Sequence, residues 1–151
     1  MFVRRIVAAL LVVAPTVAAI ALLIRWAPLP DPVGSQWSRG EVTSTQPLWM
    51  LLVPWAALTI LGMGLALGAV VHRDRTDPFR GTLYLAALLT ATSAGSCLAI
   101  LAMNLGMASS SGAVFFAALA LGPIYALIPL AVVVIRPRAA TVNPVAEAES
   151  F

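Results

Sequence analysis

The chain has 151 residues, of which 61% are hydrophobic and 10% are charged. Soluble domains carry about 25% charged and about 45–50% apolar residues, so a soluble fold of this length could not cover so much apolar surface. The length suits one compact domain and leaves no room for a separate soluble one. The composition excludes an ordinary soluble enzyme and indicates an all-α, polytopic membrane protein.

The net charge of +3 comes from nine arginines and no lysine. A nucleic-acid-binding face needs clustered basic residues, whereas these arginines are scattered at the ends of apolar runs. We therefore expect no nucleic-acid partner. Positive charge beside apolar runs is typical of membrane orientation, and the lipid bilayer is the first partner that the sequence predicts.

Four apolar runs are long enough to cross a bilayer, for which about 20 residues are needed. They predict four transmembrane helices within one domain of residues 1–136, at about 6–24, 48–71, 83–103 and 114–135. The last three runs contain no Asp, Glu, Lys, Arg or His. Because lipid offers a backbone no hydrogen-bond partner, helix is the expected conformation.

The first run permits a second interpretation. Ala19, Ile20 and Ala21 match the small-x-small pattern of signal-peptide cleavage. The apolar sequence nevertheless continues to Ile24, beyond the about 7–15 residues of a signal core. We expect a retained anchor, and cleavage would remove one helix without changing the topology of the others.

The arginine distribution predicts the orientation. Seven arginines lie before the first run, between the second and third, or after the fourth. These are Arg4, Arg5, Arg73, Arg75, Arg80, Arg136 and Arg138. Only Arg25 and Arg39 lie on the opposite side. Cytoplasmic segments are enriched in Lys and Arg, so both termini are expected in the cytoplasm and the loop 25–47 outside.

Two further features concern the source and the tail. The preference for Arg over Lys, together with the many alanines, is typical of a GC-rich bacterial genome, so a bacterial plasma membrane is expected. Residues 137–151 have too little apolar surface to fold alone, which predicts a disordered cytoplasmic tail.

Catalysis by proton transfer or by a metal needs convergent His, Cys, Asp or Glu. The chain has one histidine, His72, one cysteine, Cys97, and six carboxylates outside the apolar runs. A single His and a single Cys on different elements cannot build a metal site. We expect no enzymatic activity, no metal and no cofactor. The lack of ionisable groups inside the predicted spans also argues against secondary transport.

Helices in lipid associate through small side chains that let backbones approach. Small residues at four-residue spacing predict packing surfaces on three helices. They are Gly64 and Gly68 in the second, Ala91 and Gly95 in the third, and Ala118 and Gly122 in the fourth. We expect these three helices to form a tight core, with the first helix peripheral.

The third helix also carries four hydroxyl residues, Thr90, Thr92, Ser93 and Ser96. They could line a polar path, or they could bond to the preceding turn or to a neighbouring helix, which is the preferred interpretation. Pro123 and Pro129 should kink the fourth helix. A subunit of an oligomeric channel or transporter is therefore the alternative function.

The long polar interruption is the only stretch whose residue order looks specified. Pro28, Pro30 and Pro32 stiffen it into an extended form. A stiff loop that presents Trp37 and the polar side chains near it is typical of a recognition surface.

The pattern Leu-Pro-x-x-Val-x-x-x-Trp-x-x-Gly-x-Val at residues 29–42 resembles an outer loop in a family of unknown function. That family is found in bacterial sporulation-delaying-toxin immunity proteins and in small actinobacterial membrane proteins. The matching residues are Leu29, Pro30, Val33, Trp37, Gly40 and Val42. Gly34 stands in place of the family's Pro, Gln36 in place of its His and Thr43 in place of its Asp.

The resemblance implies an immunity-like accessory protein that binds a protein or peptide at the outer face. If the family's His and Asp carry chemistry, that role is lost here. The residues expected to bind are Leu29, Pro30, Gln36, Trp37, Arg39, Gly40 and Glu41.

Overall fold

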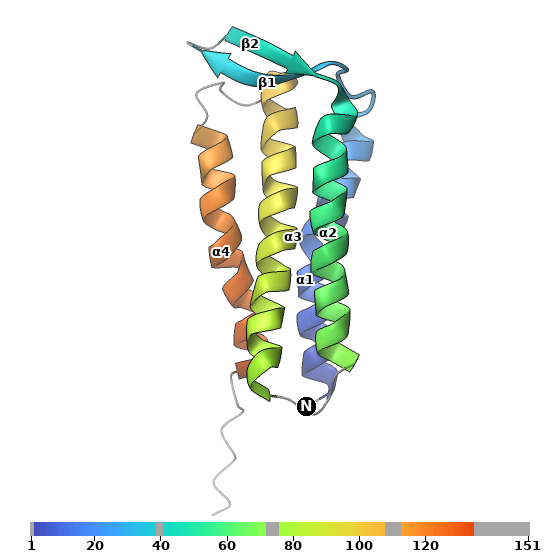
Figure 1. Cartoon of the computed structure of the whole chain (residues 1–151), viewed down its shortest axis with the longest axis vertical. Coiled ribbons are helices and arrows are strands. Elements are labelled where there is room, and N and C mark those ends of the chain that lie inside the picture. The colour runs from blue at the N-terminus through green and yellow to red at the C-terminus, as the bar shows by residue number, and fades with distance from the viewer. Residues whose placement is uncertain (1, 39–40, 72–75, 108–112, 135–151) are drawn as a thin grey trace, which may run out of the picture.

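The computed structural model describes residues 2–38, 41–71, 76–107 and 113–134. The elements in chain order are α1 (Phe2–Trp26), β1 (Val33–Ser38), β2 (Glu41–Gln46), α2 (Leu48–Val71), α3 (Thr76–Asn104) and α4 (Ala113–Val134). The helices form an up-and-down bundle, and the two strands lie across one end of it (Figure 1). The start of α1 and the end of α4 lie together at the opposite end (Figure 1).

The four expected helices are confirmed, and each is long and apolar enough to cross a membrane. The largest difference in bounds is at α3, which begins at Thr76 rather than at residue 83. Hydropathy detects only the apolar part of a helix, and this helix starts in polar sequence. The tail 137–151 and the arginines at 73, 75, 136 and 138 lie outside the described residues.

The loop 25–47 contains a two-stranded antiparallel sheet, which the all-α expectation did not include. The ladder runs from Val33 opposite Gln46 to Ser38 opposite Glu41, with register shifts on both sides of Gln36. Register shifts of this kind add a residue to one strand and break the strict alternation of side chains. The period-two pattern that marks a strand in a sequence is therefore blurred here.

Helix α1 belongs to the core, and the expectation that it would be peripheral is wrong. Its residues Ala8 and Val12 are fully buried in one cluster with Leu83 of α3 and Ala126 of α4. The Thr90 hydroxyl of α3 donates a hydrogen bond to the Val12 carbonyl oxygen over 2.9 Å. These contacts tie α1 to the rest of the bundle.

Pro15 explains a second polar contact of α1. A proline inside a helix has no N–H, so the carbonyl four residues earlier, at Leu11, loses its partner in the helix. The Tyr125 hydroxyl of α4 donates to that Leu11 oxygen over 2.7 Å. The lipid interior holds no water that could donate to this carbonyl. The Tyr125 hydroxyl therefore replaces the hydrogen bond that the proline removes.

The predicted contact of small residues between α3 and α4 is confirmed. A Cβ placed at Gly95 would lie 3.3 Å from the Cβ of Ala118. A Cβ at Gly122 would overlap the Thr92 hydroxyl. Ala91 is half-buried and lines a groove beside Gly95 and Ala118, so these small residues share the surface between the two helices.

The predicted packing surface of α2 is wrong. At Gly64 and Gly68 an added Cβ would meet no atom within 4 Å. At Gly62 it would lie 2.7 Å from Thr90 Cγ2 and 3.0 Å from the Ala86 carbonyl oxygen of α3. The close approach of α2 to α3 therefore depends on Gly62, which lies four residues before the buried Ala66, and the Gly64-x-x-x-Gly68 pattern does not mediate it.

Candidate functional site: a hairpin fixed to the end of the bundle

The candidate site is the hairpin formed by β1 and β2. Its leading segment is fixed first by Asp31, whose Oδ1 accepts a hydrogen bond from the Leu48 backbone N–H over 3.0 Å. The first backbone N–H groups of a helix lack partners within the helix, and a carboxylate at that end satisfies one of them. Asp31 thus joins the segment before β1 to the start of α2.

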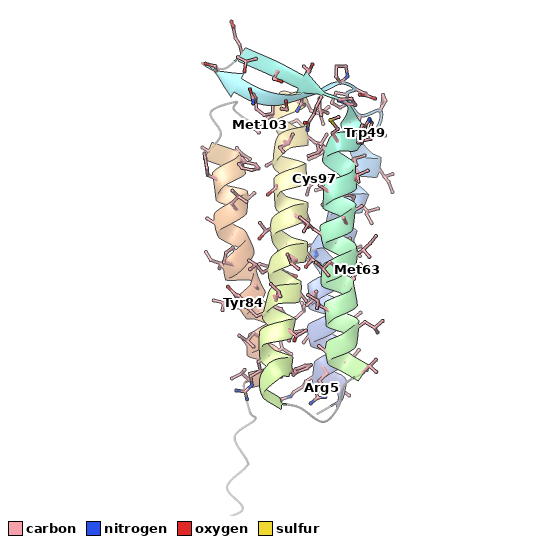
Figure 2. All side chains as sticks on the ribbon, in the orientation of Figure 1. Arg5, Trp49, Met63, Tyr84, Cys97 and Met103 are labelled. Carbon is pink, nitrogen blue, oxygen red and sulfur yellow. The ribbon has the colours of Figure 1, made fainter. Side chains whose placement is uncertain are left out.

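The base of β1 rests on an apolar cluster. Val33 is fully buried and packs in a cluster with Leu51 of α2 and with Cys97 and Leu101 of α3. Leu29 and Trp55 are among the partly buried residues around this cluster. Cys97 lies on α3 below the hairpin (Figure 2), and it is buried as a free cysteine.

Asn104 is the last residue of α3. Its side-chain amide bonds to both the backbone N–H and the backbone carbonyl oxygen of Gly34, the residue of β1 that follows Val33. The Gly34 backbone N–H donates to Asn104 Oδ1. Asn104 Nδ2 donates to the Gly34 carbonyl oxygen over 3.2 Å and to the Ile100 carbonyl oxygen over 2.9 Å. The side-chain amide thus bonds to the Gly34 backbone as a neighbouring strand would, and it caps the last turn of α3 through its bond to Ile100. We call this contact the Asn104 clamp.

The clamp leaves little room for a side chain at position 34. A Cβ there would lie 3.0 Å from both methyl groups of Val42 and 3.1 Å from Asn104 Oδ1. The backbone must approach the amide closely, which is the role of a glycine in a strand. The contact therefore favours glycine at this position, and proline would remove the N–H that donates to Asn104 Oδ1.

The fixed hairpin presents polar side chains on its outer surface. Trp37 pairs across the ladder with Val42, and Ser38 pairs with Glu41. The exposed hairpin residues are Gln36, Ser38, Glu41, Val42, Thr43 and Thr45. The single charge among them is that of Glu41, so the described hairpin surface can bind through hydrogen bonds and apolar contact.

The structure describes five of the seven residues expected to bind, and these five fall into two groups. Gln36 and Glu41 are exposed on the hairpin, and Trp37 is half-buried between them along the chain. Leu29 packs in the cluster under β1, so it supports the hairpin and does not present a binding surface, and Pro30 is half-buried beside it. Arg39 and Gly40 lie outside the described residues.

Sequence reasoning missed the residues that fix the hairpin, above all Asn104 and Asp31. A polar residue that ends an apolar run is a signal for a helix end, and Asn104 carries it. Its partner Gly34, however, lies 70 residues away in the sequence. No local pattern indicates a contact of that separation.

Two of the four hydroxyl residues considered for a polar path, Thr90 and Ser93, donate to backbone carbonyls of a neighbouring helix or of the preceding turn. Thr90 donates to the Val12 carbonyl and also lies within hydrogen-bond distance of the Ala86 carbonyl. The Ser93 hydroxyl donates to the Thr90 carbonyl oxygen over 3.3 Å. Among the residues that the structure describes, no group of three or more His, Cys, Asp or Glu gathers at one place.

The chain was compared with family models, with curated proteins and with solved structures. No family model matches the chain, and neither a curated protein nor a solved structure matches it.

Proposed function

We propose that this chain is a non-catalytic, multi-pass protein of a bacterial plasma membrane that recognises a protein or peptide partner through the hairpin. The distribution of arginines supports an orientation with both termini in the cytoplasm and the hairpin outside. The resemblance of residues 29–42 to the loop of toxin-immunity proteins supports an accessory, immunity-like role.

The observation that carries this proposal is the fixing of the hairpin to two helices, α2 and α3. An isolated two-stranded hairpin is marginally stable in water, yet this one is held by the Asp31 cap, the Val33 cluster and the Asn104 clamp. A surface that is ordered before binding loses less conformational entropy when a partner binds. Such anchoring is expected where the loop has a recognition role and is unnecessary for a simple connection.

Site-specific photo-crosslinking in native membranes tests the proposal. A photoreactive amino acid at Thr43, which is exposed and lies outside the ladder pairs, should capture the partner. The same amino acid at Met63, an exposed residue in the middle of α2, is the control and should capture only lipid. Trp37→Ala and Glu41→Ala should each lower the yield at Thr43 several-fold. An unchanged yield in both variants would refute recognition through the hairpin.

The alternative is a subunit of an oligomeric channel or transporter. The observation that favours it is the open surface at Gly64 and Gly68, because glycines at this spacing on a lipid-facing helix are typical of helix association. A chain that remains monomeric in lipid nanodiscs would contradict this alternative. A stable oligomer that conducts ions would favour it over hairpin recognition.

A further inference from the structure

A layer of hydroxyl groups divides the apolar core of the bundle. Among the residues that the structure describes, the buried polar side chains are Thr16, Thr59, Thr90 and Ser93. Along α2 the hydroxyl lies between Leu51 of one apolar cluster and Ala66 of the other. Along α3 the two hydroxyls lie between Ala87 and Cys97, which belong to the same two clusters. We call the four residues the hydroxyl layer.

The contacts of Thr90 set the register of three helices around this layer. Its Oγ1 donates to the Val12 carbonyl oxygen of α1 over 2.9 Å. Its Cγ2 faces Gly62 of α2, where an added Cβ would lie 2.7 Å away. Thr16 follows Val12 by four residues and Thr59 precedes Gly62 by three, so each lies on the same side of its helix, one turn nearer the hairpin.

Thr16 and Thr59 therefore lie at one depth on facing helices. A groove on the outer side of α1 and α2 supports this register, because the lining residues nearest the hairpin are Val13 on α1 and Ile60 on α2. On α3 the turn beyond Thr90 brings Ser93, which is buried, to the same depth. Three helices thus each contribute one short hydroxyl side chain at this level.

Two of these hydroxyls have no partner. Thr16 and Thr59 are each 5% exposed, and their Oγ1 atoms form no hydrogen bond with the described residues. A threonine in a helix can bond to the carbonyl of the preceding turn. For Thr16 that carbonyl is the one of Val12, which already accepts the Thr90 hydroxyl. A buried hydroxyl without a partner is costly, and the lipid interior offers none.

We infer that Thr16 and Thr59 bind one water molecule in the middle of the bundle. The water accepts the hydroxyl protons of both threonines and donates to the Ser93 oxygen, which keeps its lone pairs when its own proton goes to the Thr90 carbonyl. Three bonds are typical of a buried water. A hard cation prefers about six oxygen ligands, whereas this level supplies three neutral hydroxyls. The water joins α1 to α2 below the hairpin.

Water-edited solid-state NMR in lipid bilayers tests this inference. The full chain carries ¹³C-labelled threonine, and the rate of magnetisation transfer from water protons is measured for each threonine. Thr43 and Thr45, which are exposed on the hairpin, are the positive references. Thr92 is the matched control, because its buried hydroxyl also has no partner but lies at the contact between α3 and α4. Transfer to Thr16 and Thr59 should be several-fold faster than transfer to Thr92.

Thr59→Val decides whether one water serves both threonines. Valine keeps the shape of the side chain and removes the hydroxyl, so transfer to Thr16 should fall to the rate of Thr92, whereas Thr59→Ser should preserve it. Slow transfer to both threonines in the unmodified protein, or unchanged transfer to Thr16 in Thr59→Val, would overturn the inference. Fast transfer that disappears when choline replaces sodium would also overturn it, because the ligand would then be a cation.

Thermal unfolding in detergent gives a second measurement. Thr16→Val and Thr59→Val should each lower the melting temperature, because each leaves the other hydroxyl without its partner. The double variant removes both hydroxyls, so its melting temperature should fall by less than the sum of the two single shifts. Strictly additive shifts would contradict a shared water.

Discussion

Replacing Asn104 by alanine should open the hairpin while the bundle stays folded. The substitution removes the hydrogen bonds from Asn104 Nδ2 to two carbonyl oxygens, on Gly34 and Ile100, and the acceptor of the Gly34 N–H. Each bond contributes about 0.5–1.5 kcal/mol net, and a buried N–H left without an acceptor costs about 1–3 kcal/mol. The bond to Ile100 lies within α3 and does not hold the hairpin, so mainly the Gly34 contacts count. We therefore expect the free energy of opening the hairpin to fall by about 3 kcal/mol.

Hydrogen–deuterium exchange in lipid nanodiscs measures this change directly. Amide exchange reports local opening, and a loss of about 3 kcal/mol corresponds to exchange about 100-fold faster in β1 and β2. The amides of α3 below Cys97 serve as the internal reference and should exchange as before. Ser35→Ala is the control within the hairpin, since it removes one long bond, from the Ser35 hydroxyl to the Ser44 oxygen over 3.3 Å. It should accelerate exchange by less than about threefold.

Gly34→Ala disturbs the Asn104 clamp from its β1 side. Its Cβ would press on the Val42 methyl groups and on Asn104 Oδ1, so we expect faster exchange in the same amides. Adding Val42→Ala removes the methyl groups and should restore part of the protection. Unchanged exchange in Asn104→Ala, or equal effects of Asn104→Ala and Ser35→Ala, would refute the role of the clamp.

Two further predictions concern the bundle. Gly62→Ala should destabilise the protein by about 1–3 kcal/mol because the added Cβ would lie 2.7 Å from an atom of α3. Gly64→Ala should leave the stability unchanged or raise it by up to about 1 kcal/mol, because alanine has the higher helix propensity. Thermal unfolding in detergent ranks the two variants, and the reverse order would contradict the packing. Tyr125→Phe should cost about 1–2 kcal/mol by depriving the Leu11 carbonyl of its donor. Pro15→Ala gives that carbonyl an N–H of its own, so a double-mutant cycle should show coupling, and strict additivity would refute compensation by Tyr125.

The sequence predicts the features that depend on neighbouring residues, and it predicts few of the contacts between residues far apart in the chain. The four helices are visible because an apolar run long enough for a bilayer is a local property, and all four are confirmed. The contact of Gly95 with Ala118 is also visible, since small residues repeat at four-residue spacing on both helices. The same rule fails for Gly64 because it does not say which side of a helix meets its neighbour.

The hairpin was hidden for a different reason. Its two strands are short, and its ladder shifts register around Gln36, so alternation is weak. Its stability comes from Asp31, Val33 and Asn104, whose partners are brought close only after the helices have assembled. The sequence shows a stiff loop with an aromatic residue, and the surface that the loop presents depends on the bundle below it.

The uninterrupted α3 has a mechanical consequence. The other three helices contain prolines at Pro15, Pro54, Pro123 and Pro129, where an axis can bend. Beyond its first turn α3 has none, so it behaves as a stiff rod with Asn104 at one end and, at the other, Phe79 beneath the Arg5 guanidinium. A force on the hairpin at Gly34 is therefore transmitted along the rod instead of being absorbed at a hinge. The same stiffness couples a displacement of the Phe79 end of α3 to the position of Asn104 and of the strand that it holds.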